Sequence, residues 1–348
     1  MVLHYKCPNC GSDMVFDSES GTLSCGSCGR KDNVDSFPKE FVREEQEAER
    51  DGRREFTPSE YHCQNCGAVL ITDADTAATT CGFCGAGVVL ADRLSGQLAP
   101  AKVIPFTISR QQAEEAYKKW SRKKLLTPKK FRNADRIKSL TGIYVPFWLY
   151  DLNSKSKVHA SCTKVRTYSQ GDYIYTETKH FNVYRGIDLN YVKIPADASE
   201  KMDDKLMDRL EPYDYGNLKE FNMPYLTGFL AEKYNYDDKE LFPRIRERAV
   251  GYTNQYISGS INGYSSVHIT SKDIQISQNH AYYTLLPVWM LNYDYENKDY
   301  IFAMNGQTGK IVGKPPLSGA RMVMWFFIIS GFSFLAIRLI LLLGGVIL

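Results

Sequence analysis

The sequence predicts an α+β protein with two small four-cysteine modules, then a mixed β-rich domain with inserted helices, then one C-terminal transmembrane helix. Three observations support this prediction. Eight of the nine cysteines fall into two groups within the first 85 residues. Residues 141–316 hold long runs of alternating apolar and polar side chains, which are typical of strands. The last 27 residues contain a single charge, on Arg338.

The two cysteine groups are an internal duplication. Segments 5–29 and 61–85 align without a gap, and each has the spacing C-x2-C-x14-C-x2-C. Four thiolates from two facing pairs are typical ligands of a tetrahedral zinc ion in a structural site. We therefore predict two structural zinc ions, with iron in a rubredoxin-like site as the alternative. The predicted ligands are Cys7, Cys10, Cys25 and Cys28 in the first module and Cys63, Cys66, Cys81 and Cys84 in the second.

Each cysteine pair is followed by a glycine. These are Gly11, Gly29, Gly67 and Gly85. Because glycine reaches positive φ at no steric cost, the chain can turn tightly there and aim backbone N–H groups at the thiolates. With a short predicted hairpin between its pairs, each module resembles the zinc-ribbon family. His4 and His62 lie beside the cysteines but are not needed as ligands, so we expect both at the surface.

Composition divides the chain into six segments. The stretch between the modules is dense in both charge signs, which predicts a solvated linker, helical from Pro38 to about Asp51, that keeps the modules separate. The predicted segments are a first zinc ribbon at 1–36, a charged linker at 37–60, a second zinc ribbon at 61–92, a helix and basic segment at 93–140, a β-rich α+β domain at 141–316 and a transmembrane anchor at 317–348.

A helix and a strongly basic segment follow the second module. Ser109 and Gln112 form a capping box, which predicts a helix from Arg110 to about Lys123. Residues 118–138 contain ten Lys and Arg against one acid, a net charge of +9 in a chain whose total is +3. Such a segment fits a solvated surface, attraction to anionic lipid head groups, or nucleic-acid binding.

The β-rich domain is predicted to begin with a long antiparallel hairpin, because strand-like alternation continues on both sides of a turn at 169–172. Cys162 has no partner cysteine nearby, which predicts a small buried hydrophobe. Segments 144–152 and 285–293 share the pattern Pro-x-Trp, so we expect two similar strands side by side. Further elements are expected as helices at 200–210 and 237–258, the second capped by Asp237 or Asp238, and as strands at 272–277 and from residue 281 on.

The C-terminal segment 322–348 is predicted to cross a membrane. A helix of this length runs about 40 Å, against roughly 30 Å of bilayer hydrocarbon. Because no comparable segment precedes it, we expect a single-pass tail anchor in the cell membrane, with the N-terminal bulk in the cytoplasm. Lys310, Lys314 and Arg321 before the segment fit the positive-inside pattern. Arg338 is expected either to snorkel toward water or to dock a neighbouring membrane helix.

The sequence predicts a protein that is not an enzyme. It contains no GxGxxG after a strand, no P-loop lysine motif, no HExxH and no GxSxG. Sites with four thiolate ligands leave no open position for a catalytic water.

The order of these features resembles one family. The double zinc ribbon and the segments AKVIPFTISRQQAEEAYKKW, LLTPKKFRNADRIKSLTGIYVPFWLYD, PYLTGFLAEKYNYD and MNGQTGKIVGKPP are similar to the TFIIB-type zinc ribbon membrane proteins of bacilli. Members of that family are encoded beside an SPFH-domain, flotillin-like protein and a phage-shock-protein-A homologue. The resemblance covers nearly the whole chain and implies a membrane platform that recruits the SPFH protein during envelope stress. It supplies no catalytic residues.

Together, the residues and the resemblance predict a non-enzymatic, membrane-anchored zinc-ribbon scaffold. We expect it to bind cytosolic or membrane-associated proteins, with an SPFH-type protein as one partner and a membrane protein contacted through Arg338 as another. Anionic lipid head groups are expected at 118–138. The alternative is a membrane-tethered nucleic-acid-binding protein that uses the zinc ribbons and the same basic segment.

Overall fold

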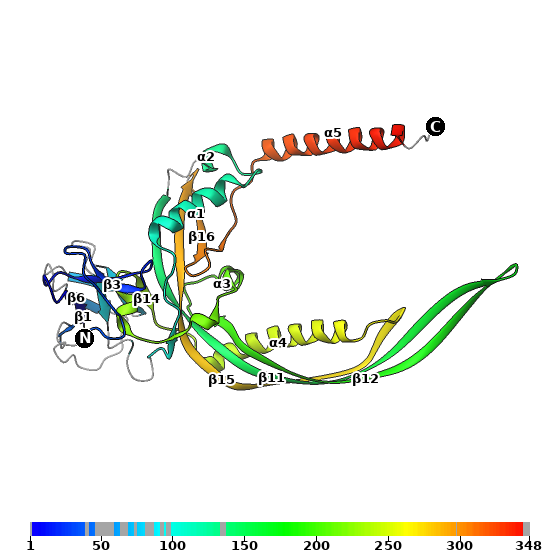
Figure 1. The fold of residues 1–348 in the computed structure, drawn as a ribbon, viewed down its shortest axis with the longest axis horizontal. Coiled ribbons are helices and arrows are strands. Elements are labelled where there is room, and N and C mark those ends of the chain that lie inside the picture. Colours follow the sequence, from blue (N-terminus) through cyan, green and yellow to red (C-terminus); the bar gives the residue numbers. More distant parts are fainter. Residues whose placement is uncertain are drawn as a thin grey trace.

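The computed structural model shows an elongated molecule with a head of short strands, a central sheet and two projecting arms (Figure 1). One arm is the C-terminal helix α5 (Gly319–Leu343). The other is a ribbon of long strands on which helix α4 (Asp238–Ser260) packs. The structure describes residues 2–38, 42–45, 59–62, 69–72, 75–80, 87–90, 94, 99–132, 137–296 and 298–343.

The first cysteine module contains a small antiparallel sheet. Strand β2 (Met14–Asp17) pairs with β3 (Thr22–Cys25), which also pairs with β4 (Lys31–Asp32). Phe16 and Leu23 from the two central strands are buried, while their neighbours along the chain are more exposed. The hairpin predicted in this module is therefore confirmed.

Strands from the region of both modules belong to one sheet. Strand β1 (Val2–Tyr5) pairs with β5 (Val42–Glu45) on one side and with β9 (Gly87–Leu90) on the other. The prediction that the modules are separate is wrong, because β1 and β9 pair with each other. The prediction of a helix is wrong at Val42–Glu45, because pairing with β1 outweighs the local helix propensity there. The other strands of this part are β8 (Thr76–Thr80), which pairs with β9, and the pair β6 (Ser59–His62) and β7 (Val69–Thr72).

Three long strands organise the rest of the chain. The predicted hairpin is confirmed as β11 (Ile137–Gln170) and β12 (Tyr173–Asp197), joined at Gly171 with φ of 62°. Strand β15 (Ser266–Tyr295) pairs with β11 along most of its length. The two strands predicted at 272–277 and from residue 281 are thus parts of a single strand.

The two segments that share Pro-x-Trp lie side by side, as expected. Pro146 of β11 lies opposite Leu285 of β15 in the antiparallel register. Shorter strands extend this sheet, in the order β13-β10-β15-β11-β14-β8-β9-β1-β5. The short strands of this order in the central part are β10 (Lys102–Val103), β13 (Lys219–Glu220) and β14 (Leu230–Glu232). In addition, β16 (Lys298–Asn305) pairs with β15, and β17 (Ile311–Gly313) pairs with β16.

Helix α4 covers one face of the ribbon. Its N-cap is Asp237, whose side chain accepts hydrogen bonds from the N–H groups of Lys239 and Glu240. Of the two predicted caps, Asp237 and Asp238, the first is therefore the one used. Along the helix the side chains Leu241, Ile245, Ala249 and Ile257 are buried. Near the end of the helix Ile257 packs with Val158, Cys162 and Val183 of the ribbon. Cys162 is fully buried, which confirms its predicted role.

The other helices begin close to their predicted starts. Helix α1 (Arg110–Arg122) has Ser109 as its N-cap with the predicted capping box to Gln112. The helix predicted at 200–210 begins at Asp204, because the preceding Asp203 caps its first turn. The remaining helical elements are α2 (Lys129–Arg132), α3 (Asp204–Leu210) and the short 3-10 turns η4 (Tyr215–Asn217) and η5 (Met223–Leu226).

An aromatic cluster packs the segments that precede α1 and β14 onto the central sheet. The ring of Phe106 stacks on Phe229 with 4.2 Å between centroids and meets Tyr144 and Trp289 edge-on at 5.0 and 5.2 Å. Trp289 also donates its indole N–H to the carbonyl oxygen of Ile108, 2.9 Å away. Aromatic pairs in these geometries contribute about 0.5–1.5 kcal/mol each beyond their buried area.

Helix α5 is long and apolar enough to cross a membrane. Residues Gly319–Ile340 have a mean hydropathy of 2.1, and none of this stretch is buried against the rest of the chain. Arg321 in its first turn donates to the carbonyl oxygens of Leu125 and Thr127 at 3.0 and 2.9 Å. The N–H of Ser318 donates to the carbonyl of Leu126 at 2.9 Å. The start of α5 is therefore held by the loop that follows α1.

Shortening Ile257 should weaken the contact between α4 and the ribbon. Ile257→Ala removes buried methyl groups and should lower the free energy of unfolding by about 2–5 kcal/mol. The neighbouring Tyr256 is 54% exposed, so Tyr256→Ala should change it by about 0.5 kcal/mol or less. Pulse proteolysis of the detergent-solubilised chain against urea measures both values. Equal effects of the two substitutions would contradict this packing.

Candidate metal centre

The first four cysteines lie on two facing turns. In one turn Cys7 donates its N–H to Ser12, and its carbonyl accepts from Gly11. In the other Cys25 donates to Arg30, and its carbonyl accepts from Gly29. The two glycines have φ of 72° and 73°, a conformation that strains other residues, as the sequence predicted for these positions. The equivalent Gly67 and Gly85 lie outside the described residues.

The sulfur positions fit a tetrahedral metal ion. The Sγ atoms of Cys7 and Cys28 are 3.5 Å apart, as are those of Cys10 and Cys25, and all four lie within 4.8 Å of one another. Four ligands about 2.3 Å from one zinc ion would be roughly 3.8 Å apart. A disulfide needs about 2.05 Å, so these pairs are not disulfides. The four thiols form one four-cysteine site of the kind that holds a structural zinc.

The surroundings of the thiols favour the anionic form at two positions. Hydrogen bonds from the side chain and the N–H of Ser12 lower the pKa of Cys10 to about 6. A backbone hydrogen bond from Arg30 lowers the pKa of Cys28. Burial raises the pKa of Cys7 to about 11, so a cation is needed to keep this third ligand ionised at neutral pH. A divalent metal supplies that charge.

The module is attached to the central domain through its hairpin and through the segment that follows β4. The N–H of Phe16 donates to the carbonyl of Thr227 at 3.1 Å, and the Phe16 ring meets Tyr225 edge-on at 5.3 Å. The Asn222 amide donates to the carbonyl of Val34 at 3.3 Å. Metal binding therefore fixes a hairpin that is itself part of the hydrophobic core.

Several predicted positions cannot be placed, and one is placed differently. Cys63, Cys66, Cys81 and Cys84, the predicted ligands of the second zinc ion, lie outside the described residues. His4 is buried, with 1% of its surface exposed, so the expected surface position is wrong. Strand β1 lies in a sheet with β5 and β9, and packing around this non-local sheet, which no local pattern near His4 indicates, buries the ring.

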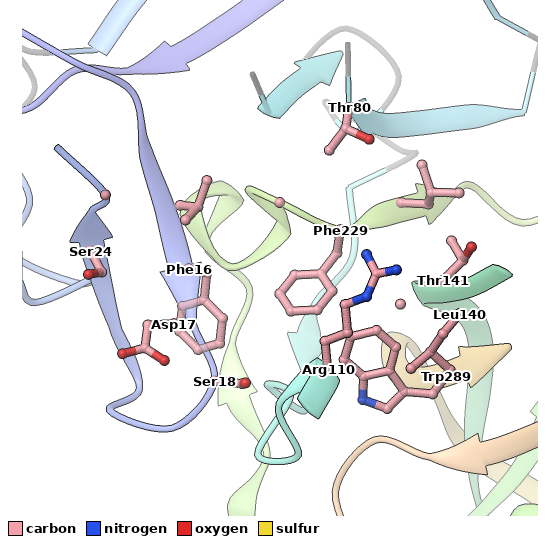
Figure 2. A pocket seen from close by; sticks show the side chains of 15 residues that line it. Phe16, Asp17, Ser18, Ser24, Thr80, Arg110, Leu140, Thr141, Phe229 and Trp289 are labelled. Carbon is pink, nitrogen blue, oxygen red and sulfur yellow. The ribbon is translucent and has the colours of Figure 1, made fainter. Parts of the chain in front are cut away.

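A cavity of about 560 Å³ lies between the first module and the central sheet (Figure 2). Phe16, Phe229 and Trp289 line it, with Arg110 from the first turn of α1. Within this lining the one carboxylate is Asp17, which accepts hydrogen bonds from Ser20 and Lys31 that lower its pKa. The cavity thus lies at the boundary between the first module and the central domain, and its carboxylate, Asp17, is already paired with Ser20 and Lys31.

Asp197 at the end of β12 is a buried carboxyl that sequence reasoning missed. It is 1% exposed, and one oxygen accepts the N–H of Ser199 at 3.2 Å. Burial raises its pKa to about 7, and Arg244 opposes that shift. Asp197 does not line the cavity of Figure 2. No local sequence signal marks it, because its burial arises where the end of β12 meets the 230–235 segment.

The basic segment meets the base of α5. Helix α1 ends at Arg122 with Lys123 as its C-cap, and the ammonium of the following Lys124 lies over the Trp120 ring, 4.6 Å from its centroid. The next residue, Leu125, is 51% exposed and accepts the hydrogen bond from Arg321 of α5. The loop that carries Lys124 and the exposed Leu125 is therefore bonded to the first turn of the apolar helix, and α1 and α2 lie beside the start of that helix (Figure 1).

The four-cysteine geometry and the paired turns define a protein of the zinc-ribbon class. In agreement, residues 5–40 match the TFIIB zinc-binding family. Over 349 residues the chain is 58% identical to the uncharacterized protein YdjG of Bacillus subtilis (strain 168), and the alignment covers 99% of each chain. The chain belongs to the family of that protein. No solved structure matches the chain.

Removing one thiol of the first module should remove one metal ion per chain. Cys10→Ser breaks the set of four thiols, so the zinc content of the purified chain should fall by one equivalent. Cys162→Ser is the matched control, because Cys162 lies in the ribbon away from the metal centre and should leave the content unchanged. Mass spectrometry of the metals measures both. An unchanged zinc content in Cys10→Ser would exclude this site.

The charge on Asp197 should make stability depend on pH. Its pKa is about 7 in the folded chain and about 3.9 in the unfolded one, so the folded state binds the proton more tightly. Stability should therefore fall as pH rises from about 4 to 7, by at most about 1.4 kcal/mol per unit. Asp197→Asn should remove this part of the dependence, as measured by urea unfolding at pH 5 and pH 8. An unchanged difference between the two pH values would contradict the assignment.

Proposed function

We propose that the protein is a non-enzymatic scaffold, anchored in the cell membrane by α5 with its N-terminal bulk in the cytoplasm. It binds membrane-associated partner proteins, among them an SPFH-type protein, in the envelope stress response. The observation that supports this most is the attachment of α5 to the folded body through Arg321 and Ser318. A helix fixed in this way holds the body in a defined position at the membrane surface.

The ribbon supports the scaffold role through its unpaired edge. Among the described strands β12 pairs only with β11, so the outer backbone edge of residues 173–193 is left without a neighbouring strand. Exposed strand edges bind partner chains by adding a strand, with affinity from main-chain hydrogen bonds. Exposed side chains such as Tyr184 and Val192, at 53% and 64%, add contact area along the same strand.

The basic segment supports contact with anionic lipid head groups. Helices α1 and α2, which carry basic residues including Arg122 and Lys129, lie beside the start of α5 (Figure 1). Each basic residue close to an anionic leaflet contributes about 1 kcal/mol. Within α5 the Arg338 guanidinium lies 5.9 Å from the ring of Phe334, and we propose that it docks a neighbouring membrane helix.

Nucleic-acid binding is the second candidate, and the same basic segment favours it. Seven of its Lys and Arg lie between 118 and 130, next to the exposed side chains of Leu125 and Leu126. Those two apolar side chains fit a lipid interface better than a phosphate backbone. A gel shift with the full chain in neutral-lipid nanodiscs separates the candidates. Binding at low salt that weakens steeply with added salt would favour nucleic acid over lipid.

A crosslinking pull-down tests the scaffold proposal. From membranes, the full chain should recover at least about ten times as much SPFH-type protein as a control chimera does. The chimera carries residues 319–348 on an unrelated cytosolic domain. The chimera has the same anchor, so the difference measures binding by the folded body. Arg338→Leu should reduce recovery of a partner membrane protein without changing that of the SPFH-type protein. Recovery of no membrane-associated protein above the chimera would overturn the proposal.

A further inference from the structure

The outer edge of strand β12 is a long row of backbone groups without a neighbouring strand. Among the described strands β12 pairs only with β11, and the register between them is regular from Tyr173 to Tyr191. Strand β15 begins at Ser266, opposite Thr163, so the end of the ribbon is a two-stranded hairpin (Figure 1). An uncovered edge of this length is a template for pairing with another strand.

The tip half of β12 carries apolar side chains on the face where α4 packs. Odd-numbered residues of β12 share that face, because Val183 is buried with the end of the helix. Tyr173 and Tyr175 are 71% and 46% exposed, and Phe181 is 37% exposed. The two tyrosines lie beyond the end of α4, so no helix covers them (Figure 1).

The root half of β12 offers an apolar strip beside the helix. Ile187 and Leu189 share the helix face of the strand and are partly buried. The ring of Tyr252 on α4 lies 6.0 Å from that of Tyr191 on β12, which places Tyr252 on the β12 side of the helix. Tyr256, four residues further, shares that side, and the exposed fractions of the two α4 tyrosines are 39% and 54%. The strip therefore has room for further apolar side chains.

We propose that the outer edge of β12 pairs with the same edge of a second copy of this chain. The two strands run antiparallel about a two-fold axis through Phe181. Tyr173 then lies opposite Leu189 of the other copy, and Tyr175 lies opposite Ile187. The uncovered tip of each ribbon is thereby placed along the helix-covered root of the other, where α4 and its tyrosines border it.

Strand geometry restricts the registers that such a pair can adopt. In an antiparallel sheet the backbone groups of successive residues point alternately to the two neighbouring strands. Bonds across the new interface therefore join odd residues to odd or even to even, so the axis passes through one residue and its copy. Opposed residues share a face, so both α4 helices lie on the same face of the joined sheet. Three strand spacings, about 14 Å, separate the two β11 strands, which exceeds the 8–10 Å that packed helices need.

The charges on β12 exclude several of these registers. An axis through Glu177, Lys179 or Arg185 would place that side chain opposite its own copy. An axis through Asn182 would place Lys179 opposite Arg185. Like charges that are directly opposed in a sheet are destabilising.

Two of the remaining registers place Glu177 opposite a cation. They are the axes through Thr178 and through Phe181. The first pairs only residues 173–183, whereas the second pairs residues 173–189 and so uses more of the free edge. Charge and length together therefore select the axis through Phe181.

The pairing deepens the scaffold proposal and rests on it for the use of the β12 edge in binding. It names a second copy of the chain as the occupant of that edge. The base of α5 lies on the same side of the ribbon as α4, so the two copies present their anchors on one side of the joined sheet (Figure 1). The contact itself needs neither a membrane nor an SPFH-type protein.

A single engineered cysteine tests the pairing and its register. Phe181→Cys places two thiols on opposed residues, within the Cα separation of about 4.4–6.8 Å that a disulfide needs. Lys179→Cys is the matched control, because that position lies on the same face but about 14 Å from its copy. The full chain in detergent, treated with oxidised glutathione, should form a disulfide-linked dimer with Phe181→Cys. Lys179→Cys and the unsubstituted chain should not.

A charge exchange tests the same register without new thiols. Glu177→Arg or Arg185→Glu alone opposes like charges at two places in the dimer, which should weaken dimerisation at least about tenfold. The double substitution opposes unlike charges again and should recover the dimer. Analytical ultracentrifugation of the full chain in detergent measures all three dissociation constants.

The two experiments separate the pairing from the scaffold role. Equal crosslinking at positions 179 and 181, no crosslinking at 181, or a double substitution that stays monomeric would overturn the pairing. So would crosslinking of position 181 to a different protein in cells. Absence of the dimer with normal recovery of the SPFH-type protein would leave the scaffold role standing, and a dimer without that recovery would overturn only the scaffold role.

Discussion

The hydrogen-bond ladder between β11 and β15 is the interaction on which the rest of the structure depends. It runs from Ile137 opposite Tyr293 to Thr163 opposite Ser266, with three irregularities along the way. One half of this ladder lies in the aromatic core, and the other half is the ribbon under α4. A single pair of strands therefore joins the folded body to its long arm without a hinge loop.

Strand β11 also connects the metal centre to the part of the molecule where α5 begins. Gly142 of this strand approaches Phe229 so closely that a Cβ there would lie 2.6 Å from the ring, and Phe229 in turn packs near Phe16 of the first module. On the other side Phe302 of β16, which pairs with β15, contacts Tyr117 and Trp120 of α1. The loop after α1 then holds Arg321. The zinc ribbon is thus one end of a continuous packed path that leads to α5.

Local signals in the sequence were sufficient for the features that depend on few neighbouring residues. Cysteine spacing predicted the four-thiol geometry of the first module, and the Ser109 and Asp237 caps predicted where two helices begin. The turn near Gly171 predicted the hairpin, and the apolar run predicted α5. Each of these signals is strong because capping, turn chemistry and hydropathy act within a few residues.

Features that depend on distant pairing were not predictable in the same way. The charged stretch at Val42–Glu45 becomes a strand because β1 offers it a partner, and the burial of His4 on β1 depends on packing around this non-local sheet. The burial of Asp197 likewise needs contacts from a different part of the chain. The continuous length of β15 was missed because polar residues at 278–280 interrupt its apolar alternation, while pairing with β11 carries the strand through them. Non-local hydrogen bonds decided each of these cases.

In the function proposed for this protein, α5 crosses a membrane with the folded body on the cytoplasmic side. Protease protection of intact cells and of inverted vesicles tests it most directly, with one epitope at the N-terminus and another after residue 348. The N-terminal epitope should be digested only in inverted vesicles, and the C-terminal epitope only from the outside of intact cells. Recovery of the intact chain in the soluble fraction, or digestion of both epitopes from the same side, would contradict it.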